Sequence, residues 1–307
     1  MQGDRSGPLI RRASAVRRAV RFNTKRILGK RTRILVEIQW RLGDEIMAIP
    51  IYESIKRAWP DSDLSVACTY PELLEGNPFV DHVIVDESHD TKEFDRRICL
   101  RDASRTVPRR DHYAQLAGVA SPENSPTVYW PTDEAPIDMN GRWVAVCTGA
   151  TWSTKRWPMA SWQTLCSTLA DRGYQLVQVG HGDERIGLAH DFVDKTSVRE
   201  AGAIVKRCAL YIGCDSGLLH LAAAVGTPAI GLFGPTDPDI LFGEHNPITA
   251  IRNGRPCAMC WNGPLTMREP GVCPLRVENC LGMIAVETVL AAALAALDHP
   301  NSADRCA

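Results

Sequence analysis

Short apolar runs alternate along this chain with longer segments whose apolar residues recur at helical spacing. The first run, Arg33–Trp40, is rich in Ile and Val and predicts a β-strand. A turn that contains glycine follows, and the isoleucines of Glu45–Trp59 then recur at helical spacing, which predicts a helix although Pro50 lies near its first turn. The chain therefore opens with a strand, a turn and a helix.

The same alternation continues through the rest of the first half. Strands are predicted at Asp63–Tyr70 and Asp81–Asp86, with a short helix at Pro71–Gly76 between them. Charged residues then dominate, and Asp111–Val119 is the one helix-like piece. The proline-rich stretch Ser121–Asn140 comes next and is typical of a connection between two domains.

The second half shows the alternation more clearly. Strands are predicted at Arg142–Gly149, Tyr174–Gly180, Leu210–Cys214 and Pro228–Gly234. Helices are predicted at Met159–Gly173, Ser197–Cys208 and Asp215–Gly226. Four strands interleaved with helices indicate an α/β fold with a doubly wound parallel sheet, in which ligands bind beyond the carboxyl ends of the strands.

The length of 307 residues also favours two domains. We expect a basic arm over residues 1–33 and a first domain over 34–130. A linker over 131–140 then leads to a second domain over 141–300.

The composition is that of a globular protein, with 45% hydrophobic and 23% charged residues. No apolar run approaches the roughly 18 to 20 residues that cross a bilayer, and no signal sequence is recognisable, so we expect a cytoplasmic location.

The net charge of -1 conceals an asymmetry between the two ends of the chain. Residues 1–33 hold eleven Lys or Arg and a single acid, Asp4, so they carry +10 and the remainder carries -11. Such an arm suits an anionic membrane surface, and a solvated tail is the alternative. Nucleic acid is not expected as a partner, because no aromatic-rich basic platform accompanies the arm.

Eleven cysteines, an odd number, do not suit a secreted disulfide framework, and several lie within apolar runs typical of buried thiols. Four of them form a separate group near the C-terminus: Cys257, Cys260, Cys273 and Cys280. A Cys-x-x-Cys pair with two further cysteines is compatible with a structural zinc or iron site, although the second pair is not tightly spaced. The alternative is a set of reduced thiols or a disulfide.

Candidate ligand-binding residues follow the predicted strand Leu210–Cys214. Asp215 and Ser216 are good N-cap residues, and Gly217 leaves the first free amides of the next helix open to an anion. The alternative is that Asp215 merely caps the helix and that His220 is a buried core histidine.

A second positive element follows the strand Arg142–Gly149. Its loop contains Lys155 and Arg156, and a lysine there can reach a phosphate as a point charge. The alternative is an exposed loop lysine. Two phosphate-seeking elements at one edge of a sheet indicate a phosphate site more strongly than either element alone.

Three segments together resemble glycosyltransferase family 9, the heptosyltransferases of lipopolysaccharide synthesis. They are LGDEIMAIPIYESIKRAWPDSDLSV, VCTGATWSTKRWP and DSGLLHLAAAVGTPAIGLFGPTDP, and the resemblance spans residues 34–297. It implies two Rossmann-like domains that face each other across a cleft (the GT-B type). The acceptor would bind mainly to the first domain and the nucleotide-sugar to the second.

The resemblance also implies an inverting displacement. Asp44, in the Leu-Gly-Asp turn, would be the catalytic base, although local grounds alone favour a plain N-cap of the following helix. Lys155 and the amides of Ser216 and Gly217 would stabilise the leaving diphosphate, so no catalytic metal or other cofactor is expected. No Asp-x-Asp motif of the kind that holds such a metal is present.

Other roles follow from position in the family pattern. Thr151, Asp215 and His220 would belong to the phosphate site, and Glu184 would bind the ribose, with its neighbour Asp183 as the alternative. ADP-heptose would be the favoured donor and a cell-envelope glycolipid the acceptor. Between Val85 and Tyr113 the chain is shorter than the family pattern, which implies a reduced first domain.

Two other functions remain open on the sequence. A non-catalytic module would bind the sugar nucleotide without transferring the sugar. An epimerase of similar architecture would isomerise the donor with no acceptor present.

Overall fold

The structure is a computed structural model that describes most of the chain. The described residues are 20–25, 27, 31–85, 90–101, 104–131, 135–243, 248–263, 269, 271–276 and 280–298. Much of the basic arm and Cys306 therefore lie outside the described residues.

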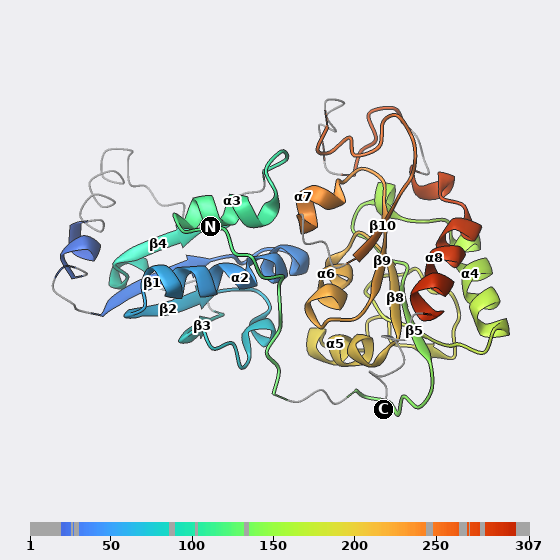
Figure 1. The fold of residues 1–307 in the computed structure, drawn as a ribbon, viewed down its shortest axis with the longest axis horizontal. Helices are drawn as coiled ribbons and strands as arrows, with labels where there is room; N and C mark the ends of the chain where they lie inside the picture. The colour runs from blue at the N-terminus through green and yellow to red at the C-terminus, as the bar shows by residue number, and fades with distance from the viewer. Residues whose placement is uncertain are drawn as a thin grey trace.

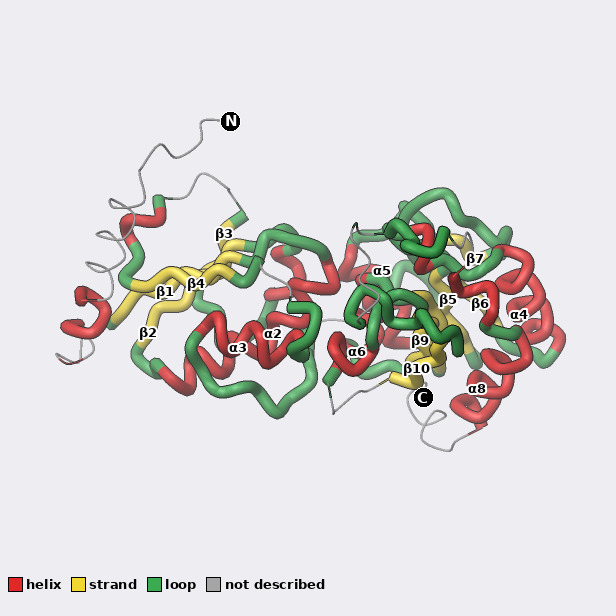
Figure 2. Tube along the Cα trace, turned by 90° about the horizontal axis from the view of Figure 1, so that it is seen from above, coloured by secondary structure: helices red, strands yellow, loops and turns green. Residues whose placement is uncertain are grey.

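Two parallel sheets form the framework, one from each half of the chain (Figures 1 and 2). The first has the order β3-β2-β1-β4 and the second the order β10-β9-β8-β5-β6-β7. Figure 2 shows the two sheets toward opposite ends of an elongated molecule, with helices α2 and α6 between them. The α/β class with two Rossmann-like domains is confirmed, and the first sheet is the smaller, as expected of a reduced domain.

The first sheet is built from β1 (Thr32–Glu37), β2 (Ser62–Ala67), β3 (His82–Ile84) and β4 (Arg96–Cys99). Its helices are α2 (Leu42–Ala58), the 3-10 turns η1 (Pro71–Leu74) and η2 (Thr91–Glu93), and α3 (Arg109–Ala117). Strand β4 was missed from the sequence because it begins with two arginines and has only one buried residue, Ile98.

The second sheet is built from β5 (Trp143–Cys147), β6 (Gln175–Gln178), β7 (His190–Asp191), β8 (Leu210–Cys214), β9 (Ala229–Phe233) and β10 (Ile248–Arg252). Its helices are η3 (Ser153–Lys155), α4 (Met159–Asp171), α5 (Val198–Arg207), α6 (Gly217–Ala224), α7 (Pro238–Phe242), η4 (Cys280–Met283) and α8 (Val286–Asp298). The edge strands β7 and β10, and helices α7 and α8, were not predicted.

Two separate apolar cores fill the faces of the second sheet. Helices α4 and α8 pack on one face, and α5 and α6 pack on the other, toward the first domain (Figure 1). Strands β5 and β8 are buried along their whole length, as strands covered on both faces should be.

The order of the strands fixes where a ligand can sit. In the first sheet β1 lies between β2 and β4, and in the second β5 lies between β6 and β8, so the direction of winding reverses beside β1 and beside β5. Loops on either side of such a reversal diverge and leave a crevice at the carboxyl ends of the strands. The turn after β1 carries Asp44, and the loops after β5 and β8 carry Lys155 and Asp215.

The described part of the basic arm packs on the first domain. Residues 20–25 are helical, and Phe22 is buried with its ring 5.6 Å from that of Trp59. Lys25 Nζ lies 2.7 Å from Oδ2 of the buried Asp95. This part of the arm is therefore anchored to the surface of the first domain through Phe22 and Lys25.

The connection between the domains is also packed. Trp130 is buried, and its Nε1 donates to the carbonyl of Glu72 at 2.6 Å. On the other side the Val128 amide lies 3.4 Å from the carbonyl of Ala224 at the end of α6. The chain thus contacts both domains just before it enters the predicted linker.

Candidate functional site

Helix α6 begins with free amides at the carboxyl edge of the second sheet. Ser216 is the N-cap, but its side chain makes no capping hydrogen bond. Among the described residues no hydrogen bond is made by the amides of Ser216, Gly217 and Leu218, and these residues are half-buried. The helix start therefore keeps the unsatisfied donors that make such a terminus an anion site.

Asp215 does not cap this helix, so that alternative reading of the sequence is wrong. Its Oδ2 accepts from Lys155 Nζ at 2.5 Å and from Thr236 Oγ1 at 2.6 Å, and its side chain is 4% exposed. Burial alone would raise the pKa of Asp215, but Lys155 and its other partners hold it below the ordinary value. The carboxylate is therefore charged, and it fixes the ammonium of Lys155.

Lys155 is accordingly no exposed loop lysine. It ends the 3-10 turn η3, its side chain is 16% exposed, and Nζ lies 4.3 Å from the centre of the Trp152 ring. The loop after β5 and the strand end of β8 thus place a cation beside the start of α6. The two phosphate-seeking elements expected from the sequence lie together.

His220 lies one turn into α6 and is buried. Its ring stacks on Phe242 with centroids 4.5 Å apart, and its Nε2 lies 3.8 Å from Oδ1 of Asp215. Burial lowers the pKa of His220 to about 4, with the charges of Lys155 and Arg109 acting in the same direction and Asp215 opposing them. His220 is therefore neutral at pH 7 and offers a hydrogen bond without a charge.

Asp44 lies in the first turn of α2, and the N-cap of that helix is Arg41. The plain N-cap interpretation of Asp44 is therefore wrong. Its Oδ1 lies 3.4 Å from the Tyr113 hydroxyl and 3.8 Å from Arg109 Nε, and its side chain is 13% exposed. Burial raises the pKa of Asp44, although Arg109, Arg41, Tyr113 and Lys155 act to lower it. A partly desolvated carboxylate of this kind is a stronger base than one in water.

The starts of α2 and α6 meet across the domain boundary, and both need glycine there. A Cβ on Gly43 would lie 2.8 Å from Cδ2 of His220, and one on Gly217 would lie 2.9 Å from Cβ of Leu42. Such distances are too short for non-bonded carbon atoms. The contact brings Asp44 close enough to Lys155 for the ammonium to act on its pKa.

Glu184 is better placed than Asp183 to meet a ligand. It is half-buried, Oε1 accepts from Arg156 Nη1 at 3.2 Å, and Oε2 is buried with no hydrogen bond among the described residues. Asp183 is exposed to solvent. Thr151 is also exposed in the loop after β5, and no contact among the described residues joins it to Lys155 or Asp215.

Several residues at this site were not predicted. Thr236 lies within the quoted motif, shortly after the end of β9, and that position at the carboxyl edge of the sheet is the signal that could have indicated it. Tyr113 and Arg109 come from α3 in the first domain. No local pattern indicates which side of α3 faces Asp44.

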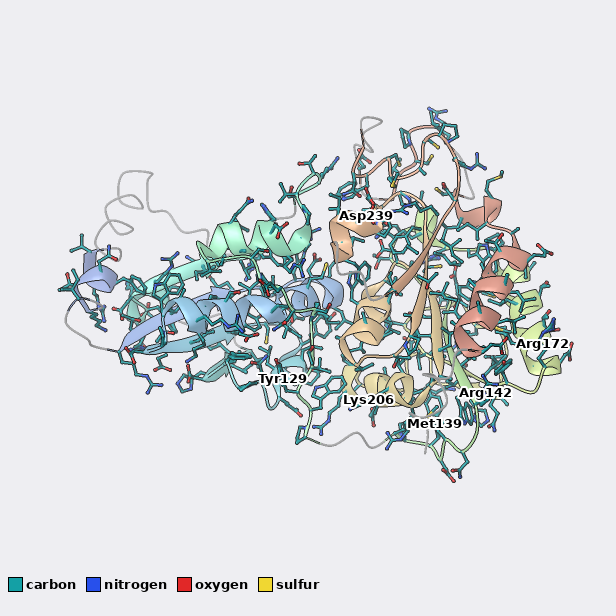
Figure 3. The ribbon with its side chains drawn as sticks, viewed as in Figure 1. Tyr129, Met139, Arg142, Arg172, Lys206 and Asp239 are labelled. Carbon is teal, nitrogen blue, oxygen red and sulfur yellow. The ribbon has the colours of Figure 1, made fainter. Side chains whose placement is uncertain are left out.

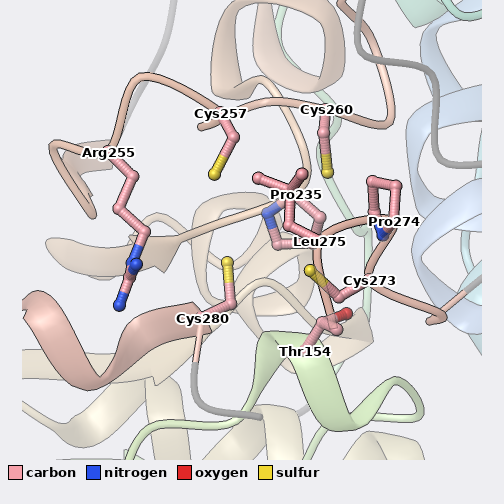
Figure 4. A pocket seen from close by; sticks show the side chains of 9 residues that line it. All are labelled: Thr154, Pro235, Arg255, Cys257, Cys260, Cys273, Pro274, Leu275 and Cys280. Carbon is pink, nitrogen blue, oxygen red and sulfur yellow. The ribbon is translucent and has the colours of Figure 1, made fainter. Parts of the chain in front are cut away.

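The four C-terminal cysteines line one small cavity (Figure 4). It has a volume of about 10 Å³, roughly the space for one water-sized atom. Burial raises the pKa of Cys280 to about 11, and the neighbouring thiols add to the shift. In this arrangement no group of three or more His, Cys, Asp or Glu among the described residues is close enough to hold a metal ion. All ten described cysteines are free thiols.

The sequence model of glycosyltransferase family 9 (heptosyltransferase) matches residues 113–268, about half of the chain. The chain belongs to this family. The matched region includes β5, β8 and α6, together with Lys155 in η3 and Asp215 directly after β8.

Known proteins similar to this chain fall in the same class. Lipopolysaccharide heptosyltransferase 1 of Pseudomonas aeruginosa is 30% identical over 135 residues, which are 41% of this chain and 38% of that protein. The similarity therefore spans less than half the length of this relative.

Solved structures show the same fold. The iron-containing dodecameric glycosyltransferase TibC of enterotoxigenic E. coli superposes with a TM-score of 0.75 at 17% identity, over 88% of this chain and 79% of that one. The E. coli ADP-heptose lipopolysaccharide heptosyltransferase II superposes with a TM-score of 0.62 at 19% identity, over 86% and 98% of the two chains.

Proposed function

We propose that this protein is an inverting, metal-independent glycosyltransferase that moves a heptose from ADP-heptose to a cell-envelope glycolipid. The observation that carries the proposal is the position of Asp44, a buried carboxylate with a raised pKa. The start of its helix packs on the start of α6, and Lys155, held by Asp215 next to the free amides of α6, is among the charges that act on it.

The donor half of the site suits a leaving diphosphate. As the bond between the anomeric carbon and the β-phosphate oxygen breaks, negative charge grows on that oxygen. The ammonium of Lys155 and the amides of Ser216 and Gly217 lie fixed beside one another, so little reorganisation is needed to stabilise the charge. The role we propose for Asp215 is to hold Lys155, because a second anion would repel the phosphate.

The acceptor half supplies the base. Asp44 would take the proton of the acceptor hydroxyl while its oxygen attacks the anomeric carbon from the face opposite the diphosphate. One bond forms on one face and one breaks on the other, so the configuration inverts. The raised pKa of Asp44 brings its basicity closer to what this transfer requires.

The other proposed contacts to the donor come from the second domain. Glu184 would accept a hydrogen bond from the ribose with the Oε2 atom that has no partner among the described residues. His220 and Thr151 would complete the phosphate site. We propose 34–130 as the acceptor domain, 131–140 as the linker and 141–300 as the donor domain.

The names of similar proteins support heptose as the sugar. The curated relative is a lipopolysaccharide heptosyltransferase, and one structural neighbour of the same fold is an ADP-heptose heptosyltransferase. The similarity to this relative spans only 38% of its length. The identities of the donor and the acceptor are therefore proposals.

The cysteine cavity is a proposed structural metal site, separate from the chemistry. Four thiols around a cavity of atomic size fit zinc or iron, provided that they draw closer on binding. The structural neighbour TibC is described as iron-containing. The metal would tie the loop with Cys257 and Cys260 to the start of η4, where Cys280 lies.

We propose a cytoplasmic enzyme that contacts the inner membrane surface through the basic residues that precede residue 20. No helix of the described part of the chain is long and apolar enough to span a bilayer. The positive charge of the arm supports attraction to anionic lipid, and nucleic acid is not proposed as a partner.

The test is a transfer assay with purified protein, ADP-heptose and an envelope glycolipid fraction. We expect release of ADP, a heptosylated product of inverted configuration and no increase in rate on adding Mg²⁺. Binding of ADP-heptose without transfer to any acceptor would favour a non-catalytic module. An isomerised sugar formed without acceptor would favour an epimerase.

A further inference from the structure

Arg109, the first residue of α3, carries a buried guanidinium with unused donors. The residue is 6% exposed. Its Nε and Nη1 atoms are buried and make no hydrogen bond to any described residue. A charged group taken out of water without partners is unfavourable, so such an arrangement indicates that another molecule supplies the partner.

Neighbouring side chains do not satisfy these donors. The carboxylate of Asp44 comes within 3.8 Å of Nε, which is too long for a hydrogen bond. The Tyr113 ring centre lies 5.7 Å from the guanidinium carbon, and its hydroxyl lies 3.4 Å from Oδ1 of Asp44. Asp44 keeps a raised pKa despite the arginine, so the two do not form a tight ion pair.

Arg109 lies beside the proposed base, with Nε 3.8 Å from Oδ1 of Asp44. Its charge also acts to lower the pKa of His220 in α6. Helix α3 lies beside α2, and one end of it faces α7 of the second domain (Figure 1). The cations that act on Asp44, namely Arg109, Arg41 and Lys155, outnumber Asp44 and Asp215.

We propose that Arg109 binds an oxyanion of a substrate beside Asp44, through the Nε and Nη1 donors that no described residue uses. The oxyanion is a phosphate oxygen of the donor or an acidic group on the acceptor, and a guanidinium suits both because it donates several charge-assisted hydrogen bonds. The assignment rests on the proposed function for its location, but it concerns binding and not transfer.

The experiment compares the full-length protein with Arg109→Gln and Arg109→Lys. Arg172→Gln is the matched control, because it removes the same charge from the exposed end of α4, at the far edge of the second domain (Figure 3). The probes are ADP, inorganic pyrophosphate, D-glucuronate and, as a neutral match for the last, D-glucose. Calorimetry gives each dissociation constant.

We expect Arg109→Gln to weaken binding of at least one anionic probe about tenfold or more, as for loss of a charge-assisted hydrogen bond. Arg109→Lys should retain part of the affinity, and Arg172→Gln should bind as the native protein does. Loss for ADP and pyrophosphate assigns the donor phosphate, and loss for glucuronate alone assigns an acidic acceptor. D-glucose should not distinguish the variants.

A second measurement needs no stable variant. The Nε–H resonance of Arg109 in the native protein, identified by its absence from Arg109→Lys, should shift when an anionic probe saturates the site. The proposal is overturned if no anionic probe binds, if Arg109→Gln binds all of them as the native protein does, or if the resonance does not move. Failure of sugar transfer in the separate assay would contradict the proposed function. It would not change the dissociation constants or the shift of the Arg109 resonance.

Discussion

Lys155 and Asp215 form the most strongly determined pair of the site. The carboxylate is 4% exposed and the ammonium 16%, and their atoms are 2.5 Å apart. A buried ion pair adds little stability compared with apolar residues of the same size. Removing one partner is costly, because the other charge then stays buried without a counter-charge. This asymmetry allows the structural role of the pair to be separated from its role in binding.

We expect Lys155→Met to destabilise the protein by about 3 kcal/mol, because Asp215 then stays buried without its main partner. The double variant Lys155→Met with Asp215→Asn should regain most of that stability. Its affinity for ADP should stay below that of the native protein. Denaturant unfolding and calorimetry measure the two effects. Recovery of ADP binding in the double variant would contradict a phosphate role for Lys155.

The pair also makes a prediction about acid. The pKa of Asp215 is depressed in the folded protein, so its contribution to stability is present above the unfolded value of about 3.9 and is lost as the pH falls through the folded value. The stability difference between the native protein and the double variant should therefore shrink only below about pH 4.

The ionised form of Asp44 should lower the stability of the fold but be required for sugar transfer. Its raised pKa means that the folded protein favours the protonated form, so the ionised group opposes folding at neutral pH. We expect Asp44→Asn to lower the transfer rate at least about 100-fold, to keep ADP binding, and to leave the melting temperature equal or higher. Asp171→Asn, at the exposed end of α4, is the control.

The pH profile checks the same residue without a substitution. As the pH falls through the raised pKa of Asp44, the base takes up a proton and transfer should slow. Because burial lowers the pKa of His220 to about 4, that residue should contribute no step near pH 6.5, where a histidine ordinarily titrates. A lower melting temperature in Asp44→Asn, with residual transfer, would indicate a structural residue.

At the scale of elements, the sequence predicted best the strands that are covered on both faces. β5 and β8 read as continuous apolar runs because every residue in them is buried. β4 was missed because it is an edge strand, paired with β1 alone, and Arg96 and Arg97 precede its one buried residue, Ile98. Edge strands carry weaker patterns since one side has no neighbour to match.

The site divides in the same way. Lys155 lies in the loop after the buried strand β5, and α6 begins shortly after the buried strand β8. The sequence could therefore place both at the same edge of a sheet. Tyr113 and Arg109 reach Asp44 only because α3 packs beside α2. That packing depends on contacts between segments far apart in the chain, and no local pattern records it.

The cysteine loop is an element whose proposed metal can be tested by its removal. If Cys257, Cys260, Cys273 and Cys280 hold zinc or iron, purified protein should contain about one metal ion per chain, as a four-thiolate site binds. Cys260→Ser should lose the metal and lower the melting temperature. Cys166→Ser, a buried thiol within α4, should keep it. Metal-free native protein of unchanged stability would contradict the site.

At the scale of the whole molecule, part of the basic arm belongs to the first domain. Phe22 and Lys25 pack against the first domain through Trp59 and Asp95, so deleting all of residues 1–33 would expose its core as well as remove charge. The informative change is confined to the arginines at positions 5, 11, 12, 17 and 18.

Replacing these five arginines with glutamine should greatly weaken sedimentation with anionic vesicles, because each basic residue near such a surface contributes about 1 kcal/mol. Transfer to a water-soluble acceptor should be unchanged, since the substitutions alter none of the proposed site residues, such as Asp44 and Lys155. Salt should weaken the native protein's sedimentation in the same way, and neutral vesicles should bind neither form. Equal sedimentation of both proteins with anionic vesicles would leave the arm as a solvated tail and place any membrane contact on the folded domains.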